Sequence, residues 1–106
     1  MSSDVEFSKL TDSFMEKILE SLIEEDLDEL DCDLAMGVLT IEFEDGTKFI
    51  MNRQTAAHQI WLAAGASAWH FQQDEAGEWL DTKGRGPLQL VLEEVLSAKL
   101  SRPISL

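Results

Sequence analysis

Carboxylate side chains are concentrated in one short stretch, SLIEEDLDELDCD, which spans residues 21–33 and contains no basic residue. Its acidic residues are Glu24, Glu25, Asp26, Asp28, Glu29, Asp31 and Asp33. Carboxylate oxygens bind hard cations such as Fe³⁺, Ca²⁺ and Mn²⁺, and they also accept Fe²⁺. The stretch is not an EF-hand loop, because Leu30 and Asp31 stand where that loop requires a ligand and a glycine. Without His or several Cys donors, we expect cation sites here to be weak, exchangeable and poorly selective.

The net charge of −13 is distributed unevenly along the chain. Residues 46–106 contain as many Lys and Arg as Asp and Glu residues, so the whole negative excess lies in residues 1–45. Such a surface repels phosphates, which argues against nucleic acid and anionic membranes as partners, and it attracts cations and basic proteins. The alternative is an acidic helix face that only keeps the protein soluble, and composition alone does not decide between the two.

A helix is expected to carry the first of these carboxylates. Ser3 and Glu6 have the spacing of a capping box, which predicts a helix from there to about Glu25. On that helix, one side is apolar, and the residues expected to point inward are Phe7, Leu10, Phe14, Ile18 and Leu22. The opposite side is acidic and is formed by Asp12, Glu16, Glu20 and Glu24.

Antiparallel strands are expected to follow the helix. From Asp31 the pattern alternates, so Asp31 and Asp33 extend the acidic side onto a strand. Residues 37–54 predict two strands joined at Asp45-Gly46 by a three-residue loop, and further strands are expected over 58–65, 68–74 and 78–82. A second helix begins near Pro87, with an apolar side expected from Leu88, Leu90, Val91, Val95, Leu96 and Leu100.

This order predicts an α+β fold: a two-layer sandwich with two terminal helices on one face of an antiparallel sheet of about six strands. The 106 residues suffice for one domain, 1–106, with a modest core. No apolar run is long enough to span a membrane and the amino end is acidic, so we expect a cytoplasmic protein. Cys32 is the sole cysteine and is expected to be a small buried hydrophobe.

The sheet face away from the helices is the second candidate site. Strand alternation turns Asn52, Gln54, Gln59, Trp61 and His70 to that face, where a Trp among amides is suited to anchor a partner. His58 is expected to have a structural role. Catalysis is not expected, because the chain has no nucleophile–base motif, phosphate loop or dinucleotide motif.

Several of these segments together resemble the bacterial frataxins. The resemblance is carried by the acidic helix that runs into Asp31-Cys32-Asp33, the segment 37–41, NRQ at 52–54, HQIWLA at 58–63, Trp69-His70-Phe71 and Glu78-Trp79. It covers nearly the whole chain, and NRQ followed by HQIWLA is its most specific part. The resemblance implies an iron-binding regulator or adaptor of iron–sulfur cluster assembly, with iron bound as Fe²⁺ and Fe³⁺ weakly and exchangeably.

The resemblance also assigns residues to two surfaces. The first surface is implied to bind iron and to dock on a basic patch of the cysteine desulfurase. Its residues are Glu16, Glu20, Glu24, Glu25, Asp26, Asp28, Glu29, Asp31 and Asp33. The second surface is implied to bind the cluster scaffold protein, and its residues are Asn52, Gln54, Gln59, Trp61 and His70. We expect a monomer in the absence of metal. Two alternatives remain open: iron storage or detoxification through metal-driven oligomers, and an acidic inhibitor that mimics nucleic acid.

Overall fold

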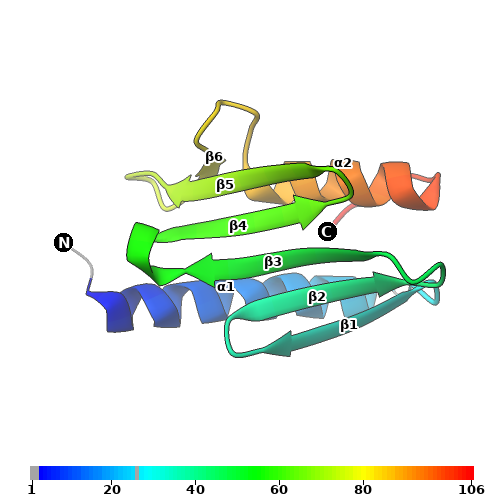
Figure 1. Ribbon diagram of the computed structural model, residues 1–106, viewed down its shortest axis with the longest axis horizontal. Coiled ribbons are helices and arrows are strands. Elements are labelled where there is room, and N and C mark those ends of the chain that lie inside the picture. The colour runs from blue at the N-terminus through cyan, green and yellow to red at the C-terminus, as the bar shows by residue number, and fades with distance from the viewer. Residues whose placement is uncertain (1–2, 26) are drawn as a thin grey trace.

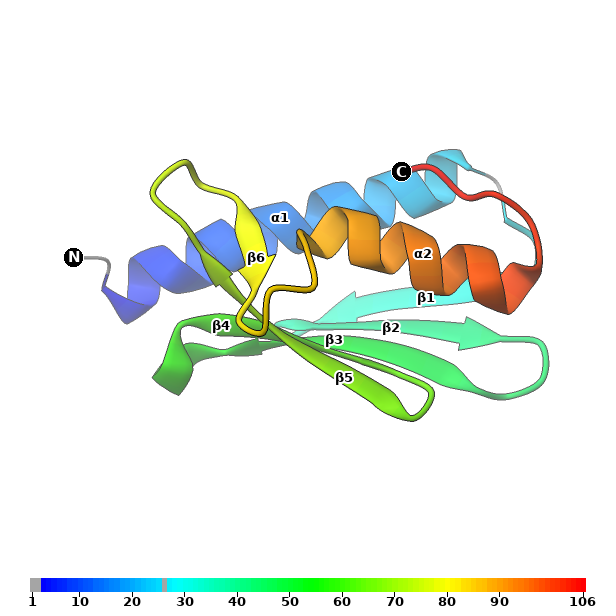
Figure 2. The same cartoon turned by 90° about the horizontal axis from the view of Figure 1, so that it is seen from above.

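The computed structural model describes residues 3–25 and 27–106, and in it two helices cover one face of a six-stranded antiparallel sheet (Figure 1). The helices are α1 (Asp4–Glu24) and α2 (Leu88–Leu100). The strands are β1 (Leu30–Ala35), β2 (Val38–Phe43), β3 (Lys48–Gln54), β4 (Gln59–Ala64), β5 (Ser67–Gln73) and β6 (Trp79–Asp81). Each strand pairs with the next in the chain, so the order is β1-β2-β3-β4-β5-β6. The turned view shows both helices in one layer above the sheet (Figure 2), which confirms the predicted α+β sandwich.

Helix α1 begins at the predicted cap but buries a different stripe of side chains. The Ser3 Oγ accepts a hydrogen bond from the Glu6 N–H at 3.1 Å. The buried residues are Phe7, Thr11, Met15, Ile18 and Leu22, whereas Leu10, which was expected inside, is 40% exposed. Burial of Thr11 leaves no polar group unpaired, because its hydroxyl donates to the Phe7 carbonyl at 3.0 Å. The inward prediction for Leu10 was therefore wrong, and Phe14 is only partly buried.

The turn between β2 and β3 has the predicted three-residue form. The Phe43 N–H donates to the Thr47 carbonyl at 2.9 Å, and Gly46 adopts a φ of +85°. In this register Leu39 lies opposite Met51 and Ile41 lies opposite Phe49. The apolar side chains of both strands consequently point to the helices.

Helix α2 follows Pro87 as predicted, but one apolar residue was assigned to the wrong side. Leu88, Val91, Leu92 and Leu96 are buried, while Leu90 is 54% exposed. Leu90 is two residues from both Leu88 and Leu92, which on a helix turns it to the opposite side from them, so the inward prediction for Leu90 was wrong. The chain then returns along the two helices (Figure 2), with the Leu106 N–H donating to Glu93 Oε2 at 2.7 Å.

His58 has the structural role that was predicted for it, whereas Cys32 of β1, which was expected to be buried, is only partly buried. His58 has a φ of +50° after the short 3₁₀ helix Thr55–Ala57, stacks on Phe7 with 4.6 Å between ring centroids, and lies 2.8 Å from Asp4 Oδ1 through Nε2. It joins the connection before β4 to the start of α1. Cys32 is half-buried against the core, and this burial raises the pKa of its thiol above the ordinary value.

Candidate functional site

The acidic ridge, defined here as residues 16, 20, 24, 25, 28, 29, 31 and 33, follows α1 onto the strand β1. Seven of its members are exposed: Glu16, Glu20, Glu24, Glu25, Asp28, Asp31 and Asp33. They lie close together because the chain reverses direction between α1 and β1. Strand β1 then presents alternate residues to the outside. Asp26, which was also predicted to bind metal, lies outside the described residues.

One ridge residue, Glu29, is neutralised by a base from the far end of the chain. Arg102 Nη1 lies 2.6 Å from Glu29 Oε2, and Nη2 donates to Oε1 at 2.9 Å, so the pair is bidentate. This hydrogen bonding lowers the pKa of Glu29 below its usual value. Within residues 3–25 and 27–106, no Lys, Arg or His forms an ion pair with the exposed ridge carboxylates. The ridge therefore keeps most of its negative charge unpaired.

The fold adds two carboxylates that the sequence analysis did not assign to the ridge. A surface hollow of about 430 Å³ is lined by Asp28, Glu29, Leu30, Asp31, Glu42, Phe43 and Glu44. Glu42 lies directly opposite Asp31 across β1 and β2, a position in which like charges repel. The sequence could have predicted this pair if the hairpin register had been worked out for β1–β2 as well as for β2–β3. A bound cation would relieve the repulsion.

The carboxylates nevertheless form an open surface. In the part of the chain that the structure describes, no three His, Cys, Asp or Glu side chains are grouped closely enough to hold a metal ion. Oxygen donors spread over a convex helix and strand suit hard cations that retain much of their water. Such a donor set is open to solvent and differs from the closed cage of a fixed structural metal.

The outer face of the sheet carries the second candidate surface, and in Figure 1 it lies in front of both helices. Asn52, Trp61 and His70 form one row across β3, β4 and β5. The Trp61 and His70 rings stack with 4.1 Å between centroids and 9° between planes. The indole is also fixed by its N–H, which donates to Gln59 Oε1 at 2.8 Å. Gln54 lies opposite Gln59, so all five residues predicted for this surface are neighbours.

The ridge and this second surface are continuous. Asp33 of β1 lies opposite Thr40, which lies opposite Ile50, which in turn lies opposite Ala63 of β4. Ala63 and Trp61 point to the same face of β4, because residues two apart share a face. A partner could therefore contact the β1 part of the ridge and the Trp61 row at the same time.

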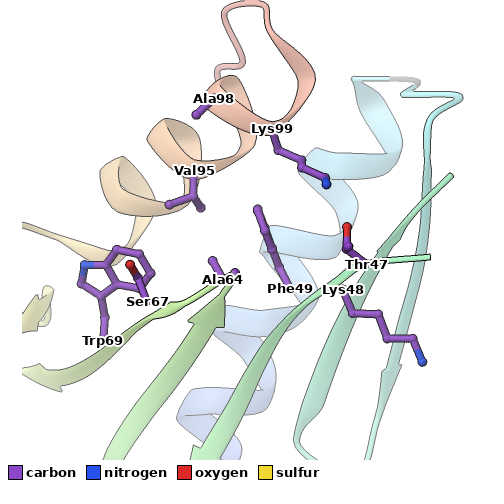
Figure 3. Close-up of a pocket in the computed structure, with 10 residues that line it drawn as sticks. Thr47, Lys48, Phe49, Ala64, Ser67, Trp69, Val95, Ala98 and Lys99 are labelled. Atoms are coloured by element: carbon purple, nitrogen blue, oxygen red, sulfur yellow. The ribbon is translucent and has the colours of Figure 1, made fainter. Parts of the chain in front are cut away.

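Another hollow lies between α2 and the ends of β3, β4 and β5 (Figure 3). It has a volume of about 630 Å³ and a lining that is mainly apolar, including Phe49, Trp69 and Val95. Its ionisable lining residues are Lys48 and Lys99, and Lys99 is paired with Asp45 at 2.7 Å. The lining therefore offers mainly apolar contact.

The sequence matches a known family along almost the whole chain. The family model described as the frataxin-like domain matches residues 1–102. The chain belongs to the frataxin family. Its relatives place it with the bacterial frataxins of the CyaY type.

Two bacterial proteins called iron–sulfur cluster assembly protein CyaY are similar to this frataxin in sequence. The protein of Thioalkalivibrio sulfidiphilus (strain HL-EbGR7) is 42% identical over 98% of this chain and 99% of its own length. That of Ralstonia pickettii (strain 12J) is 33% identical over 98% of this chain and 94% of its own. The chain therefore aligns with nearly the full length of both proteins.

Solved frataxin structures share its fold. The frataxin from Psychromonas ingrahamii superposes with a TM-score of 0.89 at 31% identity, covering 98% of this chain and 97% of that chain. The trimeric frataxin of the yeast Saccharomyces cerevisiae, complexed with ferrous iron, gives a TM-score of 0.74 at 28% identity, covering 88% and 87%. Among the described residues of this frataxin, no helix is both long and apolar enough to cross a membrane.

Proposed function

We propose that this frataxin is an iron-binding regulator or adaptor of iron–sulfur cluster assembly, and that it is not an enzyme. In this proposal the acidic ridge binds iron and docks on a basic patch of the cysteine desulfurase. The Trp61 row and its amide neighbours bind the scaffold protein on which the cluster is built. The observation that carries the proposal is the unpaired negative charge of the ridge together with a partly exposed Trp61 that stacking and a hydrogen bond hold in place.

The charge of the ridge supports a basic protein partner. Carboxylates without local counter-ions steer an oppositely charged surface into contact and raise its association rate, an effect that falls as salt is added. Glu16, Glu20 and Glu24 repeat at four-residue spacing on α1, where like charges repel by about 0.2–0.5 kcal/mol per pair. A basic partner or a bound cation would relieve this repulsion.

Iron binding is supported by the donor set. The ridge offers hard oxygen ligands, which accept Fe³⁺ readily and Fe²⁺ less tightly. Because these ligands do not form a closed cage, bound iron should exchange. Iron and the desulfurase would then compete for the same carboxylates or influence each other's binding.

The Trp61 row supports a separate contact with the scaffold. An aromatic ring that is held by stacking and a hydrogen bond loses little conformational freedom when a partner covers it. Tryptophan in such a position is a common energetic anchor of interfaces. The amides of Asn52, Gln54 and Gln59 would provide the polar rim.

Charge reversal on the ridge tests the proposed docking. The variant Glu20→Lys, Glu24→Lys, Asp28→Lys should bind the desulfurase at least tenfold more weakly in a titration, because attraction is replaced by repulsion. The matched control is Glu75→Lys, Glu78→Lys, Glu94→Lys, which changes the net charge equally at exposed positions outside the ridge. Equal loss in both variants would leave only a net-charge effect, and unchanged affinity of the ridge variant would overturn the proposal.

Iron storage or detoxification through metal-driven oligomers is the second candidate function. It is favoured by the trimeric yeast frataxin that was complexed with ferrous iron. Sedimentation of this chain under excess iron and air separates the two functions. A persistent monomer with few bound ions would exclude storage, and growth of large iron-loaded particles would favour it. The cytoplasmic location, the single domain 1–106 and the metal-free monomer stay predictions.

A further inference from the structure

Strand β1 is one edge of the sheet, and its outer side has no neighbouring strand among the described residues. An edge strand presents unpaired backbone N–H and C=O groups, which can pair with a strand from another protein. Figure 1 shows β1 at the margin of the sheet, with the turn to β2 at one end. Which of its backbone groups point outward follows from that turn.

The β1–β2 turn fixes the hydrogen-bonding pattern of the edge. Met36 and Gly37 have φ values of +53° and +77°, as in a two-residue hairpin turn, so the flanking residues Ala35 and Val38 exchange hydrogen bonds. Hydrogen-bonded pairs then recur at every second residue, at Asp33 and Asp31. The Arg53 N–H, which donates to the Gly37 carbonyl at 2.9 Å, fits the same alternation on the β3 side.

Cys32 and Leu34 therefore direct their backbone N–H and C=O groups away from the sheet. Leu30 is the third residue of this set, and its N–H already donates to the Leu27 carbonyl at 3.1 Å. In residues 3–25 and 27–106, no hydrogen bond is made to the outward backbone groups of Cys32 or Leu34. The outward backbone groups of Cys32 and Leu34, two successive outward-facing residues of the edge, are thus available for pairing.

The two sides of this edge differ in chemistry. On the helix side, a hollow of about 290 Å³ is lined by Leu22, Ile23, Leu27, Leu30, Asp31 and Cys32, and Ile23 is 66% exposed. On the outer side, Asp31 and Asp33 are exposed and form no ion pair with any described residue. An added strand would place alternate side chains beside apolar groups and beside carboxylates.

We propose that β1 is extended by a strand from a partner protein in which apolar residues alternate with Lys or Arg. The apolar side chains of the added strand enter the hollow that Ile23 lines, and its basic side chains lie beside Asp31 and Asp33. A second copy of this chain fits poorly, because pairing two β1 edges would bring their carboxylates together. The inference rests on the proposed docking of a basic partner and specifies backbone pairing at β1 as part of that contact.

A capped ten-residue peptide of alternating Lys and Val provides the probe. Its addition to the full chain should slow amide hydrogen exchange at Cys32 and Leu34, while Leu92 of α2 should not change. A peptide of the same composition with its lysines and valines in two blocks is the control. Equal protection by both peptides, or protection spread evenly along α1, would show attraction by charge alone and would overturn the inference.

Leu34→Pro gives a second test. Proline removes the outward N–H without removing a bond of the β1–β2 ladder, so the edge tolerates it. Leu34→Ala is the matched control, since it also loses the leucine side chain but keeps the N–H. The proline variant should bind the alternating peptide about tenfold more weakly than the alanine variant. Equal affinity would overturn the inference, and if the proline variant fails to fold, the exchange experiment on the natural chain decides.

The two proposals can fail separately. If the ridge reversal on Glu20, Glu24 and Asp28 leaves desulfurase binding unchanged while the alternating peptide still protects Cys32 and Leu34, the proposed function fails and the edge pairing stands. If the reversal abolishes desulfurase binding but neither peptide protects the edge, docking is through side chains only.

Discussion

Trp61 and His70 lie face to face on adjacent strands, with 4.1 Å between their ring centroids and 9° between their planes. They are directly opposite each other in β4 and β5, on the sheet face away from the helices. The Trp61 N–H is at the same time bonded to Gln59. The indole is thus held from two sides before any partner arrives.

Removal of the His70 ring should weaken scaffold binding through loss of this preorganisation. His70→Ala should cost about 0.5–1.5 kcal/mol of binding free energy, the usual value of an aromatic pair, and Trp61→Ala should cost at least about 2 kcal/mol. Calorimetric titration with the scaffold measures both. Leu80→Ala is the control, because Leu80 is exposed on β6, two strands away from Trp61. If Leu80→Ala weakens scaffold binding as much as His70→Ala does, the stacking of His70 on Trp61 has no special role in binding.

The Glu29–Arg102 pair should limit the charge that the ridge offers to cations. In Arg102→Ala, Glu29 loses its bidentate partner, its pKa returns toward the ordinary value, and both oxygens can bind metal. Mn²⁺ should then bind more tightly, as followed by its paramagnetic effect on ridge resonances. Lys83→Ala removes an exposed base outside the ridge and should leave binding unchanged. Equal tightening in both variants would point to net charge alone.

Gly37 should tolerate a side chain less well than Gly46. Both have positive φ, +77° and +85°, which costs an alanine about 1–2 kcal/mol. A Cβ at Gly37 would also lie 2.9 Å from Arg53 Cζ, whereas the space at Gly46 is open. Arg53 in turn pairs with Asp12 of α1 at 2.6 Å, so moving it disturbs the contact between sheet and helix.

Urea unfolding of Gly37→Ala and Gly46→Ala compares the two positions. The first variant should be the less stable by about 1 kcal/mol or more, as expected for added crowding. Equal losses would mean that the Arg53 side chain moves aside without cost.

Asp81 should make stability depend on acid pH. Its side chain is fully buried and accepts hydrogen bonds from the Arg85 guanidinium and from the Arg85 and Lys83 backbone N–H groups, and this lowers the pKa of Asp81 below its ordinary value. Because the folded state then binds the proton less readily than the unfolded state, the stabilisation is complete above the ordinary pKa. It is lost as the pH falls below that value.

Asp81→Asn should therefore reduce the free energy of unfolding by about 1–3 kcal/mol at neutral pH, and the difference from the natural chain should shrink below about pH 4. Chemical unfolding at several pH values measures this. A difference that stays constant down to strongly acid pH would show that the charge of Asp81 does not contribute. Asp45 should act in the same direction, since Lys99 and Thr47 lower the pKa of its carboxyl group.

Local patterns in the sequence were enough for the layers and for most of the site. The capping residues, the period of two after Asp31 and the Asp45-Gly46 loop predicted the helix, the strands and the register of Leu39 with Met51, because each depends on neighbours a few residues apart. The alternation also placed Asn52, Trp61 and His70 on one face. The prediction was wrong at Leu10, which lies at the margin of a helical stripe, where the surface packed against it decides burial. It was also wrong at Leu90, which lies on the side of α2 opposite Leu88, Leu92 and Leu96.

The sequence by itself determined the acidic excess of residues 1–45 and the faces on which its carboxylates and Trp61 lie. Only the tertiary structure decided that Arg102 neutralises Glu29, that Glu42 and Glu44 join the ridge, and that His70 stacks on Trp61. The reason is physical: periodicity fixes which face of an element a side chain occupies. Contacts such as Glu29–Arg102, 73 residues apart, depend on how separate elements pack together.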